Sequence, residues 1–321
     1  MEQARTAGHV PVMCVRIVEL LAPALDAAGA TYVDCTLGLG GHAEAILTAR
    51  PGARLIGIDR DRHALDAAAA RLAPFGDRVR LVRARYDELP EVLAEAGRPH
   101  VQAILADLGL SSMQIDRPER GFAYRVDAPL DMRMDDTQAS TAADLVNAAS
   151  AAELTTILRR YGDERFADRI ARRIVAERAA EPFSTSARLV RVIESAIPMA
   201  ARRTGGHPAK RTFQALRIAV NDELAALAGL LPAAIDALAP GGRLAVLAYH
   251  SGEDRLVKRA LRDAATDRAP RGLPAVPAEL RARLVLLTRG AERPGTDETE
   301  DNPRAGSARL RAAERINEVA A

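Results

Sequence analysis

The sequence predicts an α/β fold in which helices cover both faces of a parallel β-sheet and one helical insertion interrupts it. Apolar strand candidates alternate with helix candidates over residues 31–107. The alternation stops between about residues 111 and 207, where only helical periodicity is found. A strand candidate returns at residues 244–249, so we expect the sheet to resume after the insertion.

Composition sets limits on the class of protein. The 321 residues are enough for two domains, and Ala, Leu, Val and Ile must fill the cores because aromatic residues make up only 3%. The two cysteines, Cys14 and Cys35, form no disulfide framework, which favours a reducing cytoplasm. No apolar run approaches the roughly 20 residues of a membrane span, so no membrane partner is expected.

The first part of the chain shows the alternation clearly. Apolar residues at helical spacing predict a helix before the first strand, and Ala-rich or capped stretches predict one after each strand. Short runs rich in Val, Ile and Leu predict the strands. The helices are expected at 16–25, 42–49, 62–72 and 89–96, and the strands at 31–34, 54–59, 79–82 and 101–107.

The insertion and the segment after it are also read from periodicity. A capping box predicts a helix at 150–161, apolar residues spaced by four predict one at 166–174, and Pro198 ends a third at 189–197. A long helix is expected at 211–231, a fifth strand at 244–249, and a late hairpin from strands 284–287 and 308–312. The expected division is 1–112 and 208–321 for the sheet domain and 113–207 for the insertion.

A glycine loop joins the first strand to the next helix. Gly38, Gly40 and Gly41 let a ligand lie against the backbone at a helix start, and the loop also satisfies the dinucleotide pattern GxGxxG/A. Asp34 stands four residues before the first glycine, where it would repel a pyrophosphate but attract a cationic ammonium group. The loop therefore favours S-adenosylmethionine over a dinucleotide, with Asp59 on the ribose hydroxyls.

Distinctive residues stand at four strand ends: Asp34, Asp59, Asp107 and the run Tyr249-His250-Ser251. Ligands of an open parallel sheet gather at the carboxyl ends of its strands, so these residues are expected at one site. Methyl transfer from a sulfonium needs no metal, and the scattered histidines suggest no metal site. Cys35 lies too close to the glycine loop to be the preferred nucleophile, so covalent attack on a pyrimidine ring is not expected. An exocyclic amine or a hydroxyl is therefore favoured as the methyl acceptor.

The insertion is basic. Residues 159–211 contain 13 basic and 6 acidic side chains, a net charge of +7. Arg169, Arg172 and Arg173 lie roughly on one face of a predicted helix, which favours a patch for a polyanion. The alternative is a solvated helix face whose arginines are balanced by interleaved acids.

Nine segments in order give the chain a family resemblance. They are residues 36–42, 58–61, 107–112 with Gln114, 119–122, 127–135, 161–166, 211–217, 250–255 and 302–304. Together they resemble the bacterial 16S rRNA (cytosine-N4)-methyltransferase family, also called MraW, over residues 9 to about 315. The run PLDMRMD at 129–135 is the most specific of them.

The resemblance implies a Rossmann-like methyltransferase that uses S-adenosyl-L-methionine. The acceptor it implies is the N4 amine of a cytidine in the decoding region of 16S rRNA, in the small ribosomal subunit. It further implies that Gly40, Gly41 and His42 hold the methionine end of the cofactor and Asp59 its ribose. Tyr86 would flank the adenine, and Asp107 and Gln114 would complete the cofactor site.

For catalysis we expect Asp107, with Ser111, to accept a hydrogen bond from the amine, and His250 to be a second proton acceptor. A structural hydrogen bond is the alternative role for His250. The residues assigned to RNA binding are Arg120, Arg133, Arg169, Arg172, Arg173, Lys210 and Arg211.

Two positions depart from the family pattern: Arg16, where an acid is usual, and Gly252, where a bulky residue is usual. Two rival functions stay open, a NAD-dependent oxidoreductase and an RNA-binding assembly factor that keeps S-adenosylmethionine as a structural ligand. The sequence also leaves open whether the chain works as a monomer or a homodimer, and in which assembly state its substrate is recognised.

Overall fold

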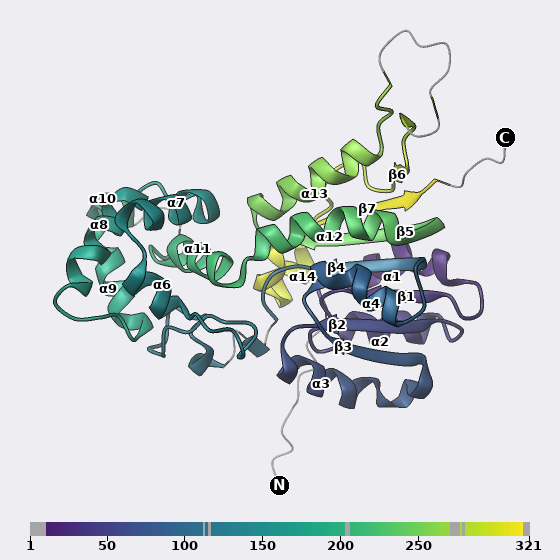
Figure 1. Ribbon diagram of the computed structural model, residues 1–321, viewed down its shortest axis with the longest axis horizontal. Helices are drawn as coiled ribbons and strands as arrows, with labels where there is room; N and C mark the ends of the chain where they lie inside the picture. The colour runs from purple at the N-terminus through teal and green to yellow at the C-terminus, as the bar shows by residue number, and fades with distance from the viewer. Residues whose placement is uncertain are drawn as a thin grey trace. The chain divides into compact units, whose positions relative to one another are not determined.

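A computed structural model describes residues 11–111, 113–114, 117–202, 206–269, 277 and 280–316. The chain divides into two compact units. The first combines Met1–Gly109 with Ala226–Ala321, and the second is Leu110–Ala225. Figure 1 shows the strands in the first unit and a cluster of helices in the second.

The first unit is built on a seven-stranded sheet in the order β3-β2-β1-β4-β5-β7-β6. The first five strands run parallel, and β7 is antiparallel to both β5 and β6. This confirms the doubly wound sheet and the late hairpin. The strands are β1 (Thr31–Asp34), β2 (Arg54–Asp59), β3 (Val79–Arg83), β4 (Val101–Asp107), β5 (Leu238–Ala248), β6 (Leu284–Leu286) and β7 (Arg309–Arg315).

Helices pack on both faces of this sheet, because successive strand side chains point to opposite faces. One core joins Val33, Ile58 and Ile104 to α4 (Leu89–Glu95), α12 (Glu223–Ala237) and α13 (Ser251–Ala264). The other core joins Tyr32, Leu55 and Leu105 to α1 (Cys14–Leu21), α2 (Gly41–Ala49) and α3 (Arg62–Leu72). Short helical turns complete the unit: η1 (Ala22–Leu25), η2 (Ala73–Arg78), η3 (Tyr86–Glu88), α14 (Thr296–Asp301) and η6 (Pro303–Ser307).

The second unit has a core of its own, in which Leu158, Ile170 and Leu189 are fully buried. Helices α7 and α11 cross closely, since a Cβ on Gly162 would lie 2.5 Å from the carbonyl oxygen of Arg211. The described helices here are η4 (Pro118–Arg120), α6 (Ala142–Ala148), α7 (Ala151–Gly162), α8 (Ala167–Arg178), α9 (Ser186–Ala196), α10 (Met199–Arg202) and α11 (Lys210–Asn221).

The structure corrects the long helix expected at 211–231. It is two helices, α11 and α12, because Asp222 adopts a left-handed conformation with φ of 52° and ends α11. The Arg217 guanidinium spans the break with two bonds of 2.8 and 2.9 Å to the Glu223 carboxylate. Since α11 packs against α7, the compact second unit runs to residue 225, beyond the boundary of 207 expected from the sequence.

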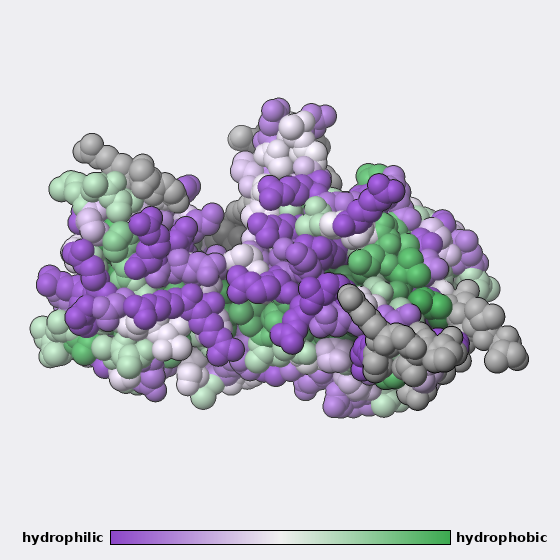
Figure 2. All heavy atoms as spheres, turned by 90° about the horizontal axis from the view of Figure 1, so that it is seen from above, coloured by the Kyte–Doolittle hydropathy of each residue, from purple (hydrophilic) through white to green (hydrophobic). Residues whose placement is uncertain are grey.

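Hydrophilic side chains cover much of the face shown in Figure 2, with smaller hydrophobic patches between them. Within the described residues, no single helix combines the length and apolar content of a membrane span. Helices α11 and α12 meet both criteria only when taken together, and they are bent by 59°.

Candidate functional site

Three carboxylates stand at the ends of neighbouring parallel strands. Asp34 ends β1, Asp59 ends β2 and Asp107 ends β4, and β1 lies between the other two in the sheet. Strand β5 continues the series, with Tyr249 directly after its last residue. The sequence-predicted strand ends of the first unit therefore meet at one edge of the sheet.

The glycine loop joins this edge to α2. Gly38 and Gly40 have φ of 52° and 75°, in the left-handed region that favours glycine. Gly41 opens α2 beside Pro11, whose Cγ would lie 2.5 Å from an added Cβ. The start of α2 thus has backbone N–H groups without a side-chain cap, which suits an anionic group such as a carboxylate.

Asp34 is the most buried of the three carboxylates, at 1% exposure. The Tyr32 hydroxyl donates to it over 2.9 Å, and the Thr36 backbone N–H donates over 3.2 Å. Burial outweighs these hydrogen bonds and the nearby His42, and it raises the pKa of Asp34 to about 6. Asp34 therefore brings a buried negative charge to this end of the sheet, and that charge depends on pH.

Asp59 organises the loop around it. One oxygen accepts the Gly38 N–H over 2.8 Å and the other accepts the Asp61 N–H over 2.8 Å. Asp61 in turn caps α3 by accepting the His63 N–H. Burial raises the pKa of Asp59 despite these bonds. Each oxygen keeps a further lone pair, which leaves the carboxylate able to accept two ribose hydroxyls.

Asp107 is held from several sides while its side chain stays 24% exposed. Its backbone N–H donates to the Thr36 hydroxyl over 2.6 Å, and the Tyr249 hydroxyl donates to Oδ1 over 2.8 Å. The Nδ1 atom of His42 lies 3.7 Å from Oδ2. Asp107 is thus a fixed, partly accessible hydrogen-bond acceptor.

His42 links this carboxylate to the start of the described chain. Its Nε2 atom lies 3.0 Å from the Val12 carbonyl oxygen, which can only accept, so this nitrogen carries a proton. A second proton on Nδ1 would make the ring a cation beside Asp107. His42 is 7% exposed and lies beside Asp107, so its contacts help to fix that carboxylate, and its role toward the cofactor stays a prediction.

Tyr249 is a site residue to which sequence reasoning gave no role. Burial, followed by the neighbouring Asp107 carboxylate, raises the pKa of its hydroxyl well above the usual value, so it stays a proton donor at neutral pH. The available signal was its position after β5, since Asp107 pairs with Leu247 in the β4–β5 register. Thr36 was likewise overlooked.

His250 caps α13. Its Nδ1 accepts the backbone N–H groups of Gly252 and Glu253 over 3.2 and 3.4 Å, and its Nε2 lies 3.2 Å from the Glu253 carboxylate. The side chain is 9% exposed, and Nε2 is inaccessible. These contacts favour the structural role for His250 over that of a proton acceptor. They also involve Gly252, one of the departures from the family pattern.

The remaining predicted site residues lie apart in the chain. Tyr86 opens η3 and packs against the first core of the sheet unit. Ser111 and Gln114 belong to the second unit. There, the Ser111 N–H donates to the Gln114 side-chain oxygen over 3.1 Å, and the Gln114 N–H donates to the Ser111 hydroxyl over 3.3 Å.

Arg120 and Arg133 form hydrogen bonds within the segment that contains PLDMRMD. The Arg120 guanidinium donates to the carbonyls of residues 133 and 134. Arg133 makes two bonds of 2.8 Å to the Asp131 carboxylate and further bonds to the carbonyls of residues 136 and 138. These arginines have few donors left for RNA, so their contacts favour a structural role.

The arginines of α8 are exposed, as predicted, but two of them have acidic neighbours. Arg172 is paired with Asp168, and Arg173 lies 2.8 Å from Glu177. Arg169 is exposed in the same helix. At the start of α11, Lys210 is exposed and Arg211 donates to the Asp163 carbonyl over 2.8 Å. Arg169 and Lys210 keep the clearest capacity to bind a polyanion.

The sheet edge fits S-adenosylmethionine by the chemistry of its donors. Asp34 supplies negative charge near the glycine loop, which suits an ammonium group, and the start of α2 suits the adjoining carboxylate. Asp59 accepts, as a ribose diol requires. A dinucleotide pyrophosphate would meet buried acids instead. No group of three metal-ligand side chains is gathered in the part of the chain that the structure describes.

Comparison with known proteins agrees with this arrangement. Residues 6–316 match the MraW methylase family. The chain is 58% identical over its full length to the Ribosomal RNA small subunit methyltransferase H of Streptomyces avermitilis, and the match covers all of that protein. It is 60% identical to the protein of the same name from Thermobifida fusca, with 97% of this chain and 94% of the relative covered.

Proposed function

Because the chain belongs to the MraW methylase family, we propose that it methylates the exocyclic N4 of a cytidine in the decoding region of 16S rRNA. S-adenosyl-L-methionine is the methyl donor. The relatives named as rRNA small subunit methyltransferases support an RNA substrate within the small ribosomal subunit. We place this reaction in the cytoplasm. Membership of a methylase family argues against the alternative of a NAD-dependent oxidoreductase.

The observation that carries the proposal is the state of Asp107. It ends β4 as a partly exposed acceptor, oriented by Tyr249 and His42, at the edge where Asp34 and Asp59 also lie. A nucleobase amine presents N–H donors, and a carboxylate fixed by its neighbours can accept from them without reorganising. Position and hydrogen-bonding capacity therefore both suit an amine acceptor.

The cofactor would be held by residues of the first unit. Gly40 and Gly41 would hold its methionine end, with the uncapped N–H groups at Gly41 and His42 toward its carboxylate; the Gly40 N–H itself donates to the Leu37 carbonyl. Asp59 would accept the ribose hydroxyls and Tyr86 would flank the adenine. Gln114 is kept as a cofactor-binding residue because the family resemblance implies it. When bound, the cofactor supplies a methyl group on a sulfonium, which needs an in-line nucleophile and a place for the released proton.

Asp107 would supply the orientation. The lone pair of the cytosine amine is delocalised into the ring, and a hydrogen bond from an N4 proton to Asp107 would turn that lone pair toward the methyl group. The same carboxylate can then accept the proton that leaves the nitrogen. Tyr249 would hold Oδ1 in place. We assign His250 to capping α13, and keep Ser111 as an accessory acceptor.

The RNA must reach this site with the target base out of its stack. We propose that the basic second unit contacts the phosphates on either side of that base, through Arg169, Arg172, Arg173, Lys210 and Arg211 among others. Phosphate contacts of this kind position a substrate without reading its sequence. Their contribution falls with salt concentration because bound counterions are released.

The test uses tritiated S-adenosylmethionine, small ribosomal subunits from a strain that lacks this activity, and digestion of the RNA to nucleosides. We expect the label in N4-methylcytidine. Asp107→Asn should lower the methylation rate about 100-fold, within the range for a lost general base, while the dissociation constant of the cofactor changes less than about threefold. Asp66→Asn, an exposed change on α3, is the matched control.

Label in another nucleoside would reject the acceptor, and full turnover by Asp107→Asn would reject the role of that residue. Binding of RNA and cofactor with no methyl transfer to subunits, free rRNA or assembly intermediates would favour the assembly-factor alternative.

A further inference from the structure

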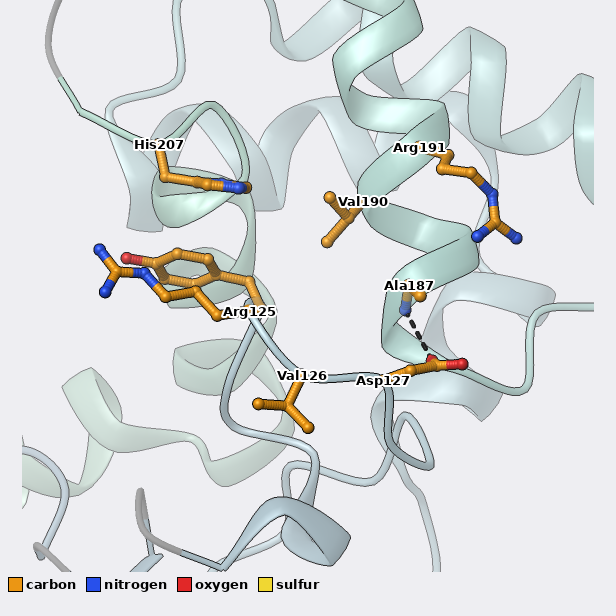
Figure 3. A pocket seen from close by; sticks show the side chains of 8 residues that line it. Arg125, Val126, Asp127, Ala187, Val190, Arg191 and His207 are labelled. Carbon is orange, nitrogen blue, oxygen red and sulfur yellow. Dashed lines mark hydrogen bonds between the residues drawn. The ribbon is translucent and has the colours of Figure 1, made fainter.

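A pocket of about 360 Å³ opens on the second unit. Its lining comes from residues 124–127, from α9 and from His207. In Figure 3, Arg125 and His207 form one side, Val190 and Ala187 of α9 face them, and Val126 and Asp127 lie between. Its size is at the lower end of the range for ligand sites, which suits one small planar group.

Stacked rings form the first side of the pocket. The Tyr124 and His207 rings have centroids 4.6 Å apart and are tilted by 32°. The edge of Phe213 supports Tyr124 at 5.9 Å, and the Arg125 guanidinium lies 5.9 Å from the centre of the Tyr124 ring. Rings and guanidinium planes held in this way are the surfaces on which unpaired nucleobases stack.

Arg125 and Arg191 bring two positive charges to the pocket, and the Asp127 carboxylate lies close enough to Arg191 to interact with its charge. Arg125 and Arg191 are both exposed, and within the described residues neither forms an ion pair with a carboxylate. This separates them from Arg172 and Arg173 of α8, whose charges are balanced by Asp168 and Glu177. An anion at the pocket would therefore meet the Arg125 guanidinium and, beside Asp127, that of Arg191, and both can donate to an RNA phosphate.

Asp127 adds a negatively charged hydrogen-bond acceptor to the lining of the pocket. It accepts the Ala187 N–H over 3.0 Å at the start of α9, and this bond holds the pKa of the carboxyl below its usual range. The carboxylate is exposed and retains lone pairs. An ionised acceptor of this kind pairs with a base amino group and repels the carbonyl oxygens of uracil.

From these features we propose that the pocket binds one unpaired nucleotide of the RNA substrate, other than the one that is methylated. Its base lies between the Tyr124–His207 stack and the valines, its phosphate meets Arg125 and Arg191, and an amino group of the base donates to Asp127. The pocket would thereby fix the register of the RNA strand. This proposal rests on the proposed function, since it takes RNA as the substrate.

The main experiment compares two double variants of the full chain, each lacking two exposed arginines. Arg125→Ala with Arg191→Ala removes the pocket charges. Arg259→Ala with Arg262→Ala removes charges on α13, where both arginines lie near Asp263. Binding of a fluorescent single-stranded RNA that spans the methylated nucleotide is measured at several salt concentrations, together with cofactor affinity and methylation.

We expect the pocket variant to bind RNA at least about tenfold more weakly. The slope of its log binding constant against log salt concentration should fall in magnitude by roughly one to two, whereas the α13 variant keeps the wild-type slope. Cofactor affinity should be unchanged in both. Equal RNA affinity and equal slope in the two variants would overturn the proposal that the pocket binds a nucleotide, and an acidic peptide would then be the alternative occupant. Absent methylation by the wild type would overturn the proposed function instead, while the binding comparison would still report on the pocket.

Two further measurements test how the pocket recognises the nucleobase. Tyr124→Phe should keep RNA affinity and Tyr124→Ala should lower it roughly tenfold, as expected for one lost stacking contact. Thermal unfolding shows whether Tyr124→Ala is folded, and if it is not, the arginine variants still decide. Oligoadenylate and oligocytidylate should bind more tightly than oligouridylate in the wild type, and Asp127→Asn should remove that difference. Equal binding of all three by the wild type would reject the role of Asp127.

Discussion

Asp34, Asp59 and Asp107 are the same residue type at equivalent strand ends, yet their surroundings make them different groups. Asp34 is fully buried and titrates near pH 6, Asp59 is tied to two backbone N–H groups, and Asp107 is partly exposed with one oxygen on Tyr249. The sequence predicted that all three belong to one site. It could not predict their differences, because these arise from side chains such as Tyr32 and Tyr249 that the fold brings in.

The raised pKa of Asp34 predicts how stability changes with pH. An unfolded Asp titrates near pH 4 and the folded one near pH 6, so folding disfavours the charged form. Asp34 therefore contributes most below pH 4, and its contribution is lost as the pH rises through about 6, up to about 3 kcal/mol. Urea unfolding of wild type and Asp34→Asn at pH 4 and pH 7 measures this loss as the difference between the two proteins. Parallel pH profiles would contradict the prediction.

Tyr249 predicts a kinetic effect. Tyr249→Phe removes only the hydroxyl that orients Asp107, so we expect methylation to slow about tenfold, as for one hydrogen bond that is needed in the transition state. Cofactor affinity should stay within about twofold. Tyr161→Phe in the second unit is the control, and equal rates for the two variants would show that the bond does not orient Asp107.

At the scale of elements, sequence reasoning succeeded where a pattern is local and repeated. Strands β1, β2 and β4 appear at the expected residues, because each is a short apolar run that ends in an acid. Reasoning failed where one residue decides. A helical pattern continues through Asp222, but that residue turns left-handed and breaks the helix. Helix α13 was overlooked because its start depends on His250 acting as a cap, a role that is usually taken by Ser, Thr, Asp or Asn.

The segment 129–135 illustrates the same limit. The sequence identified this segment as distinctive but did not indicate its structural role. In the structure, the Asn221 side chain at the end of α11 donates to the Met132 carbonyl over 2.7 Å and accepts the Met134 N–H over 2.8 Å. Met132 itself is buried with φ of 62°, a conformation that the surrounding bonds must stabilise.

Asn221→Ala is therefore expected to destabilise the second unit by about 2 to 4 kcal/mol, since it leaves buried backbone groups without partners. Asn221→Asp keeps the acceptor but replaces the donor to the Met132 and Arg217 carbonyls with a buried carboxylate oxygen, so at neutral pH it should cost at least as much. The free energy of unfolding from urea titration, followed by circular dichroism, checks both. A loss below about 0.5 kcal/mol in Asn221→Ala would show that the segment folds without this side chain.

At the scale of the whole molecule, the two units have separate hydrophobic cores. The sequence predicted a helical insertion from the break in strand rhythm. Its compact boundary at residue 225 could not be predicted, because it depends on α11 packing against α7 rather than on the start of a new pattern.

Separate cores predict unfolding in more than one step. Calorimetry should resolve two transitions, or one whose van't Hoff enthalpy is well below the calorimetric value. S-adenosylmethionine at about 100 times its dissociation constant stabilises its binding unit by roughly 2.7 kcal/mol, so one transition should shift more than the other. A single two-state transition that shifts as a whole would show that the units unfold together.

The discontinuity of the first unit also affects the order of events during synthesis. Strand β4 leaves the ribosome long before its neighbour β5, because the whole second unit is translated between them. The second unit is contiguous and can fold as soon as it emerges, whereas the nascent sheet waits with an open edge at β4. Strand β7, which joins β5 to β6, ends at residue 315, so the sheet is completed only after the chain has been translated about 90 residues beyond the second unit.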